Sequence, residues 1–331
     1  MANIDALPER VDLLVVATAA GQMAELMDNI IGSGKVESVI VIPGGLGETA
    51  GSETLMARLR EAIEASRGNT DGGPIVLGPN CLGVRSRPGC YDTFFIPESK
   101  LDPRRTAPAQ RTALVSQSGA FAVTRLSNLE CLDPSFAISF GNQLDITVSD
   151  ILGVVGARDD VDCIGVYVEG FNDLDGLDFV RTIADVKARG KVVILYKAGR
   201  TEPGRTATEG HTASIAGNYD VCTAAAANAG AIVADTLAEF EQLVALATAL
   251  HDKVVRGRRI GVISNAGYET VAMADAITGA RYRVELGRLV EPTVARIAET
   301  LKQHGLDSLI NIRNPLDLTP MSNDEVYEAC V

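Results

Sequence analysis

Short apolar runs alternate with longer amphipathic stretches along most of this chain. The runs have the length of buried strands and fall at residues 11–17, 38–42, 74–77, 112–115, 164–168, 192–196 and 260–263. The amphipathic stretches repeat their apolar positions with a helical period, at residues 21–31, 53–65, 120–129, 177–188, 237–250 and 270–277. This alternation predicts an α/β fold of consecutive doubly wound parallel-sheet domains.

Two breaks in the pattern divide the chain. Residues 97–111 are rich in proline and charge, and residues 251–259 are a basic stretch before a new strand. We therefore expect three α/β units, at 1–105, 106–254 and 255–331. A polar lead-in at 1–10 and a helix that stops in mid-course at 324–331 indicate truncation of the first and third units.

Composition narrows the class of protein. Of 331 residues, 46% are hydrophobic but only 5% are aromatic, so small and β-branched side chains must do most of the packing. The 30 basic and 43 acidic residues give a net charge of −13, which disfavours nucleic-acid and anionic membrane partners. Six Cys without a CxxC pair, no visible signal peptide and no apolar run of ~20 residues predict a cytoplasmic protein.

Three turns share one design, in which an apolar strand runs through small residues into a helix. The first contains Ser116, Gln117, Ser118 and Gly119, the second Ser264, Asn265, Ala266 and Gly267, and the third Pro43 and Gly44. In the first two, the unpaired amides and the dipole of the following helix suit a phosphate. Each turn alone also fits an ordinary capped helix start, but two in consecutive units favour anion binding.

His211 is the histidine most suited to chemistry. It lies in the polar, glycine-flanked segment 208–217, which predicts a loop, whereas His251 and His304 fit structural or solvated positions. A histidine that carries phosphate needs one free ring nitrogen and an acceptor that fixes the tautomer on the other. Glu169, at the end of the strand at 164–168, is a candidate acceptor, although a glutamate there could equally face solvent.

Several common chemistries lack a sequence signature here. The chain has no Walker A motif, HExxH motif, GxSxG elbow or Cys–His metal cluster, so we expect no metal site of its own. Its glycine-rich stretches do not have the spacing of a dinucleotide fingerprint. A redox enzyme or a hydrolase therefore has little support.

A series of short motifs runs in order over nearly the whole chain. They are GPNCLG (78–83), LVSQSG (114–119), SFGN (139–142), YVEG (167–170), YKAGR (196–200), HTASIAG (211–217), VISNAG (262–267) and NPLDL (314–318). In this order they resemble the motifs of nucleoside-diphosphate-forming acyl-CoA synthetases, the family of ADP-forming acetyl-CoA synthetases and succinyl-CoA synthetase α subunits. The resemblance implies a partial Rossmann-like CoA-binding domain followed by flavodoxin-like ligase domains.

The resemblance also implies roles for residues. His211 matches the family's phosphohistidine, and Glu169 matches the glutamate that orients it. Ser116 to Ala120 and Ser264 to Gly267 match the starts of the two helices whose N-termini face the phosphohistidine. Asn80 and Cys81 match the region near the thiol end of CoA, and Pro43 and Gly44 are assigned to the CoA side by position.

The implied reaction interconverts acyl-CoA, phosphate and ADP with a carboxylate, CoA and ATP, through an acyl phosphate and phosphohistidine. CoA, phosphate and ATP or ADP with Mg²⁺ are the implied ligands, and a small carboxylate or acyl-CoA is the substrate. The family's nucleotide site lies in an ATP-grasp module, which this sequence lacks. We therefore expect an ATP-grasp subunit or domain as partner, and an oligomer.

Departures from the family leave alternatives open. The glycine-rich loop that holds CoA phosphates has no equivalent here, and Ala213 stands where the family has glycine. One alternative is a non-catalytic module that senses CoA or acyl-CoA. Another is a phosphate- or nucleotide-binding Rossmann protein of a different family, which would leave the His211 segment unexplained.

Overall fold

The computed structural model describes residues 4–48, 51–97, 109–129, 131–209, 218–279 and 283–331. The chain divides into two compact units, Met1–Asp252 and Lys253–Val331, and each is described by itself. The second unit begins within the basic stretch that marks a break in the sequence. The further boundary expected at residue 105 falls inside the first unit and stays a prediction.

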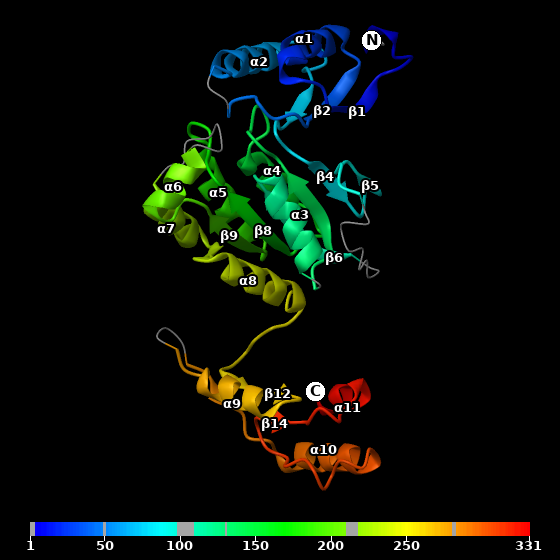
Figure 1. Cartoon of the computed structure of the whole chain (residues 1–331), viewed down its shortest axis with the longest axis vertical. Coiled ribbons are helices and arrows are strands. Elements are labelled where there is room, and N and C mark those ends of the chain that lie inside the picture. The colour runs from blue at the N-terminus through cyan, green and yellow to red at the C-terminus, as the bar shows by residue number, and fades with distance from the viewer. Residues whose placement is uncertain (1–3, 49–50, 98–108, 130, 210–217, 280–282) are drawn as a thin grey trace. The chain divides into compact units, whose positions relative to one another are not determined.

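A three-stranded parallel sheet comes first along the chain, in the order β1-β2-β3 (Figure 1). The strands are β1 (Val11–Val16), β2 (Val36–Val41) and β3 (Ile75–Leu77), with the 3₁₀ turns η1 (Ile4–Ala6) and η2 (Ala20–Gln22) and the helices α1 (Met23–Ser33) and α2 (Glu53–Ser66). Helix α1 buries Met23, Met27 and Ile30, which recur at the helical period. It ends where Gly34 adopts the left-handed conformation that stops a helix.

A seven-stranded sheet forms the centre of the first unit, in the order β10-β9-β8-β6-β7-β4-β5. Its strands are β4 (Gly83–Ser86), β5 (Tyr91–Asp92), β6 (Gln110–Ser116), β7 (Pro134–Ser139), β8 (Cys163–Val168), β9 (Val192–Lys197) and β10 (Ile232–Val233). The strands from β10 to β7 are parallel. Strand β4 joins them antiparallel to β7, and β5 pairs with β4.

The parallel strands have a flavodoxin-like order. Numbered along the chain from β6, the spatial order β7-β6-β8-β9-β10 is 2-1-3-4-5. The chain moves from β6 to β7 on one side and then returns to place β8 on the other side. Ligands of such sheets bind outside the carboxyl ends of the strands at this switch point, between β6 and β8.

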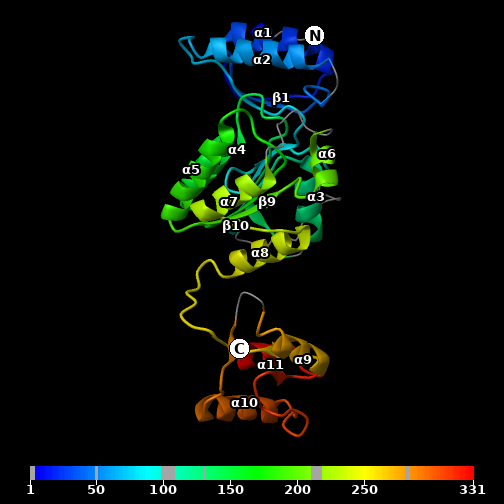
Figure 2. The same cartoon turned by 90° about the vertical axis from the view of Figure 1, so that its left-hand side faces the viewer.

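Helices cover both faces of the large sheet. They are α3 (Gly119–Asn128), α4 (Val148–Gly156), α5 (Asp175–Ala188), α6 (Glu202–Glu209), α7 (Tyr219–Ala229) and α8 (Leu237–Ala249). Figure 2 shows α4 and α5 on one side of the sheet and α3 on the other. Successive residues of β6 alternate between the two cores, with Ala113 and Val115 in one and Leu114 in the other.

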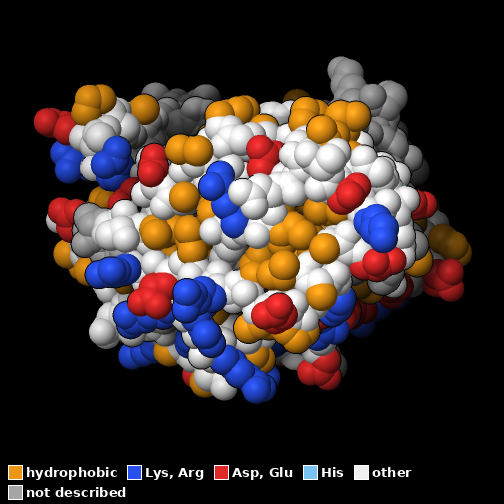
Figure 3. All heavy atoms as spheres, turned by 90° about the horizontal axis from the view of Figure 1, so that it is seen from below, with side chains coloured by type: hydrophobic (Ala, Val, Ile, Leu, Met, Phe, Trp, Pro, Cys, Tyr) orange, Lys and Arg blue, Asp and Glu red, His pale blue; other side chains and the backbone are white. Residues whose placement is uncertain are grey.

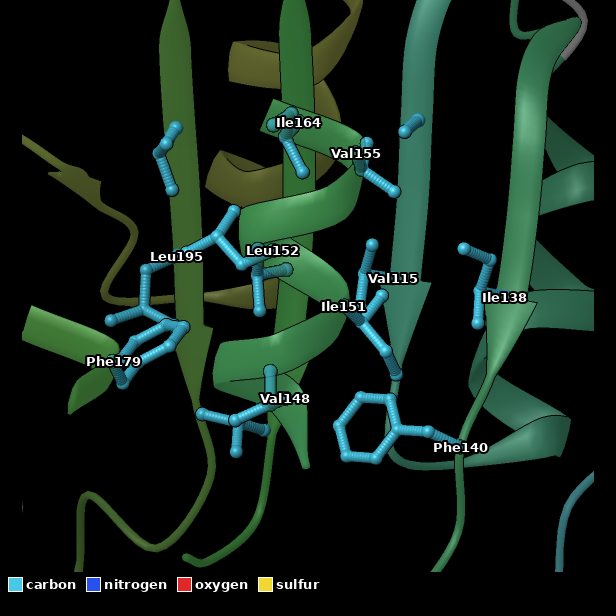
Figure 4. Close-up of a cluster of buried hydrophobic side chains, with 14 of the residues drawn as sticks. Val115, Ile138, Phe140, Val148, Ile151, Leu152, Val155, Ile164, Phe179 and Leu195 are labelled. Carbon is cyan, nitrogen blue, oxygen red and sulfur yellow. The ribbon is translucent and has the colours of Figure 1, made fainter. Parts of the chain in front are cut away.

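Helix α4 illustrates how the sequence forms the larger core. Thr147 and Asp150 make a reciprocal capping box at its start. Its apolar residues Val148, Ile151, Leu152 and Val155 recur at the helical period and are all buried. Figure 4 shows them facing the strand residues Val115, Ile138, Ile164 and Leu195.

The second unit is smaller. It contains β11 (Arg259–Ile260), β12 (Ile263–Ser264), β13 (Glu285–Leu286), β14 (Leu316–Asp317), α9 (Gly267–Asp275), α10 (Glu291–Gln303) and α11 (Asp324–Cys330). The strands form two parallel pairs, β11 with β13 and β12 with β14. A core that includes Ile297, Leu301 and Val326 joins α10 and α11 to β14.

Several large apolar side chains of the second unit are exposed. They include Tyr268, Val271, Met273, Val290, Leu309 and Met321. In the space-filling view of Figure 3, hydrophobic side chains gather into patches between basic and acidic ones. Apolar surface of this kind is commonly buried by association with other protein surfaces.

The α/β prediction with parallel sheets and flavodoxin-like topology is confirmed. The expected ranges leave out several elements of the large sheet and its helices, among them β7 and α4, and the strand expected at 260–263 is divided between β11 and β12. Strand β7 escapes detection because its six residues, PSFAIS, mix polar and apolar types although all are buried. Among the described residues, no helix is long and apolar enough to cross a membrane.

Candidate active site

A cavity of about 250 Å³ lies at the switch point of the large sheet. It is lined by residues that follow β2, β6, β7 and β8, together with residues that precede β4 and follow β5. Asn80, Cys81, Ser118, Gly119 and Glu169 all border it. The structure thus brings together sequence-predicted residues that are far apart along the chain.

The N-terminus of α3 forms one wall. Ser118 caps the helix by accepting a hydrogen bond from the Phe121 amide at 3.3 Å. Gly119 is required by space, because an added Cβ would lie 2.7 Å from Leu82 Cγ. Ser116 is fully buried, and its hydroxyl donates to the Ser118 carbonyl at 2.7 Å. Ser116 therefore shapes the turn, and anion binding by the first-turn amides and the helix dipole stays a prediction.

Gln117 anchors the end of β8. Its buried side-chain oxygen accepts hydrogen bonds from the Glu169 amide at 2.7 Å and from the Gly170 amide at 3.0 Å. The Gly170 carbonyl accepts a third bond from Gln143 at 3.0 Å. The contacts described for Gln117 thus position the backbone that carries Glu169.

The Glu169 side chain lies in the cavity wall and is only 6% exposed. The Tyr167 hydroxyl donates to its Oε1 at 3.0 Å. Burial and the neighbouring Glu169 charge both raise the pKa of Tyr167, so its phenol remains a donor at physiological pH. A carboxylate held in this way can accept a further hydrogen bond, such as one from an imidazole N–H.

Lys197 lies behind Glu169 at the end of β9 and is 2% exposed. Its side-chain nitrogen donates hydrogen bonds to the backbone carbonyl of Glu169 at 2.7 Å and to that of Ala198, the next residue along the chain, at 2.8 Å. Burial lowers the pKa of Lys197, while Cys222 and Glu169 act in the opposite direction. The lysine is therefore a buried amine that donates to two backbone carbonyls close to the candidate site.

The four residues assigned to the CoA side are adjacent in space. The Asn80 amide donates to the Pro43 carbonyl at 3.0 Å, and Asn80 Oδ1 lies 3.3 Å from the position of a Cβ on Gly44. Asn80 has a left-handed backbone with φ 57°. Cys81 follows it directly, so one corner of the cavity contains the turn after β2 and the turn before β4.

The Cys81 thiol is a poor nucleophile in this setting. Its Sγ lies 3.4 Å from the Val41 carbonyl, to which it donates. Burial raises the pKa of Cys81 to about 12. The thiolate is the reactive form of cysteine, so Cys81 contributes packing and shape to the cavity.

We expect thiol modification at pH 8 to separate the cysteines into two classes. Cys90 and Cys131 are exposed and should react within minutes, whereas Cys81 and Cys163, whose pKa values burial raises to about 12, should react only after unfolding. Disulfide-exchange titration with mass-spectrometric mapping measures this. A Cys90→Ser/Cys131→Ser variant should lack the fast phase, and fast labelling of Cys81 in the native chain would contradict the burial.

The same shifts predict a loss of stability in alkali. The pKa of each buried thiol is raised by folding, so its contribution to stability is fully present below the ordinary thiol pKa of about 8.5. That contribution is lost as the pH rises towards 12. The urea concentration at the midpoint of unfolding should therefore decrease as the pH is raised from 9 to 11. In a Cys163→Ala variant this decrease, measured relative to the variant's own midpoint at pH 8, should be smaller.

The second predicted turn belongs to the second unit. Ser264 is buried, and its hydroxyl donates to a carboxylate oxygen of Glu269. Helix α9 starts after Ala266, and Asp317 Oδ2 lies 3.0 Å from the position of a Cβ on Gly267. Asn265 is exposed. Unlike the turn before α3, this turn has two carboxylates beside it.

His211 lies outside the described residues, so its role and its pairing with Glu169 stay predictions. Among the residues that the structure describes, no group of three or more His, Cys, Asp or Glu side chains could hold a metal ion.

Sequence reasoning missed residues that the structure places at the site. Asn142 lines the cavity, and its side-chain amide donates to the Leu46 carbonyl at 2.8 Å and to Glu48 Oε1 at 2.6 Å. Tyr167 contacts Glu169. A signal for Tyr167 was available, because side chains two apart on a strand share a face. Asn142 belongs to the SFGN motif, but sequence reasoning assigned it no role, since its contacts come from a distant loop.

Residues 109–249 match the family described as the succinyl-CoA ligase like flavodoxin domain. This range covers the parallel part of the large sheet from β6 to β10 and the helices that cover it. The match agrees with the 2-1-3-4-5 strand order.

The whole chain is similar to ADP-forming acetate–CoA ligases. It is 27% identical over 327 residues to the α subunit of acetate–CoA ligase (ADP-forming) II of Pyrococcus furiosus, covering 98% of this chain and 66% of that subunit. It is 31% identical over 315 residues to acetate–CoA ligase (ADP-forming) I of Archaeoglobus fulgidus, covering 94% of this chain and 42% of that protein. The chain thus spans a little under two thirds of the first relative and about two fifths of the second.

Solved structures show the same likeness. The dinucleotide forming acetyl-coenzyme A synthetase 1 of Ca. Korarchaeum cryptofilum, in complex with phosphate and ADP, is 25% identical with a TM-score of 0.77. The similarity covers 99% of this chain and 66% of that one.

Proposed function

Because this chain is an α-subunit-like member of the NDP-forming acyl-CoA synthetases, we propose that it carries the phosphohistidine centre of such an enzyme. One observation supports this most directly: the Glu169 carboxylate and the N-terminus of α3 line the same cavity as Asn80 and Cys81. A base-orienting carboxylate, an anion site and the region assigned to CoA therefore meet at one point. The activity of the complete enzyme and its ligands are part of the proposal.

In the proposed reaction, phosphate attacks the thioester carbonyl of acyl-CoA, and CoA leaves as the thiol while an acyl phosphate forms. The first-turn amides of α3 hold the phosphoryl oxygens and stabilise their charge. A ring nitrogen of His211 then attacks phosphorus, and the carboxylate leaves. Glu169 accepts a hydrogen bond from the other ring nitrogen, which keeps the attacking nitrogen unprotonated and balances the charge on the ring.

The second half of the proposed reaction needs another module. Phosphohistidine passes its phosphoryl group to ADP, and we assign the ADP and Mg²⁺ sites to an ATP-grasp subunit or domain. The Pyrococcus relative is itself an α subunit, which supports a partner of this kind. The exposed apolar side chains of the second unit are suited to such association and to an oligomer. We also assign the assembly to the reducing cytoplasm.

Labelling of His211 tests the proposal. Radiolabelled acetyl phosphate, with Mg²⁺ and no nucleotide, should give the chain an acid-labile, base-stable label. His211→Asn should abolish the label, and the matched control His304→Asn, at an exposed histidine, should retain it. Absence of label from acetyl, propionyl and succinyl phosphates on a well-folded chain would overturn the proposal, and a CoA-binding module without catalysis would replace it.

A further inference from the structure

Tyr167 connects the two walls of the cavity. Its hydroxyl donates to Glu169 Oε1 at 3.0 Å, and its ring stacks on Phe121 with centroids 4.1 Å apart and planes inclined by 17°. Phe121 lies in the first turn of α3, and its amide donates to the cap residue Ser118. A continuous set of contacts thus runs from the anion-binding turn through the tyrosine to the carboxylate.

The backbone contacts of Glu169 do not determine where its carboxylate lies. Gln117 and Lys197 hold the main chain at the end of β8. The side chain beyond Cα still has three torsions, and the last of these has a broad preference in glutamate. The hydrogen bond from Tyr167, a side chain that is itself held by stacking on Phe121, restricts these torsions and helps to orient the carboxylate.

Tyr196 provides an internal comparison. It lies in the same aromatic cluster, with its ring centroid 5.8 Å from that of Tyr167 and 6.4 Å from that of Phe121. Within the described part of the chain, the Tyr196 hydroxyl makes no hydrogen bond. The two tyrosines therefore share packing and differ in contact with Glu169.

We propose that Tyr167 is a positioning residue, whose hydroxyl holds the Glu169 carboxylate in the orientation that His211 requires. This inference rests on the proposed function and adds a residue to its site. Tyr167 does not touch the reacting atoms. It acts through Glu169, and its stack on Phe121 keeps the carboxylate aligned with the N-terminus of α3.

The test compares Tyr167→Phe with Tyr196→Phe in the full chain. Both changes remove one oxygen and leave the ring, so thermal unfolding should show that both variants fold. Single-turnover phosphorylation of His211 is followed over a range of acetyl phosphate concentrations. We expect Tyr167→Phe to lower the maximal rate about 10- to 100-fold, as loss of an orienting partner commonly does, with the half-saturating concentration unchanged. Tyr196→Phe should behave as the unsubstituted chain does.

The outcomes separate the two proposals. An unsubstituted chain that takes no label contradicts the proposed function itself. If the unsubstituted chain takes label and Tyr167→Phe is phosphorylated at the same maximal rate as Tyr196→Phe, only the role of Tyr167 is overturned. The same holds if Tyr167→Phe changes only the half-saturating concentration of acetyl phosphate. As a second measurement, adding Tyr167→Phe to Glu169→Ala, which removes the acceptor of the tyrosine hydroxyl, should cause little further loss, because the tyrosine acts only through the glutamate. Full additivity of the two effects would also overturn the inference.

Discussion

Replacing Gly141 with alanine is expected to lower the free energy of unfolding by about 3 kcal/mol. Gly141 has φ +61°, and an added Cβ would lie 2.0 Å from the Pro79 carbonyl oxygen and 2.5 Å from that of Asn80. Both are backbone atoms, so the loop after β7 must move away from the turn before β4. Urea unfolding followed by circular dichroism measures the loss.

Two other glycines serve as controls for this prediction. Gly190 also has a positive φ, of +80°, but open space around it, so Gly190→Ala should show only the backbone strain, about 1 kcal/mol. Gly153 lies within α4 with Thr182 Cγ2 at 3.8 Å from the Cβ position, so Gly153→Ala should be neutral or slightly stabilising. If Gly141→Ala lowers the free energy of unfolding by no more than Gly190→Ala does, the two loops do not approach each other as closely as described.

Gly141→Ala should also impair the candidate site. The Asn142 amide donates to the Pro79 carbonyl at 2.9 Å, and both Asn80 and Asn142 line the cavity. A shift of either loop therefore moves the corner assigned to CoA. Glycine at position 141 is needed where the two turns meet, because only a residue without a side chain allows the SFGN motif to lie this close to the GPNC motif.

The second large effect is expected on chemistry. On the basis of the proposed function, Glu169→Gln should slow phosphorylation of His211 by about 10²- to 10⁴-fold. The amide keeps the volume of the side chain and can still accept a bond from Tyr167. It removes the negative charge that would stabilise the imidazole ring as it becomes cationic. Rapid-quench measurement of the acid-labile label gives the rate.

A glutamate away from the cavity provides the control. Glu61 is exposed on α2, and Glu61→Gln should leave the rate within about twofold. If Glu169→Gln takes label at the unsubstituted rate while His211→Asn takes none, then His211 is phosphorylated without help from Glu169. The predicted pairing, and the inference about Tyr167 that depends on it, would then be abandoned.

The periodicity of the chain was sufficient for most of the fold. Buried parallel strands such as β8 and β9 are continuous apolar runs, and helices such as α2 and α5 repeat their apolar residues at the helical period. Strand β7 could not be recognised in this way, because its serines are buried by neighbouring strands. Hydrogen bonds such as that from Ser135 to the Gln110 carbonyl make that burial possible.

Spacing along the chain also could not place β4 and β5. Both precede the proline-rich break, yet β4 pairs with β7, so residues 83–92 belong to the large sheet. This pairing brings Asn80 and Cys81 to the switch point. A register between strands about fifty residues apart depends on the shape of the whole sheet and has no local signal.

The sequence by itself determined the α/β class, most of the strands and helices, and the candidate residues for chemistry, including Glu169 and the turn before α3. These follow from local periodicity, from the capping preferences of small residues and from the order of short motifs. Only the tertiary structure decided what those residues contact. It assigned Gln117 to the backbone of Glu169, Ser116 to the turn and Tyr167 to the carboxylate, because hydrogen bonds between strand ends depend on which strands lie side by side.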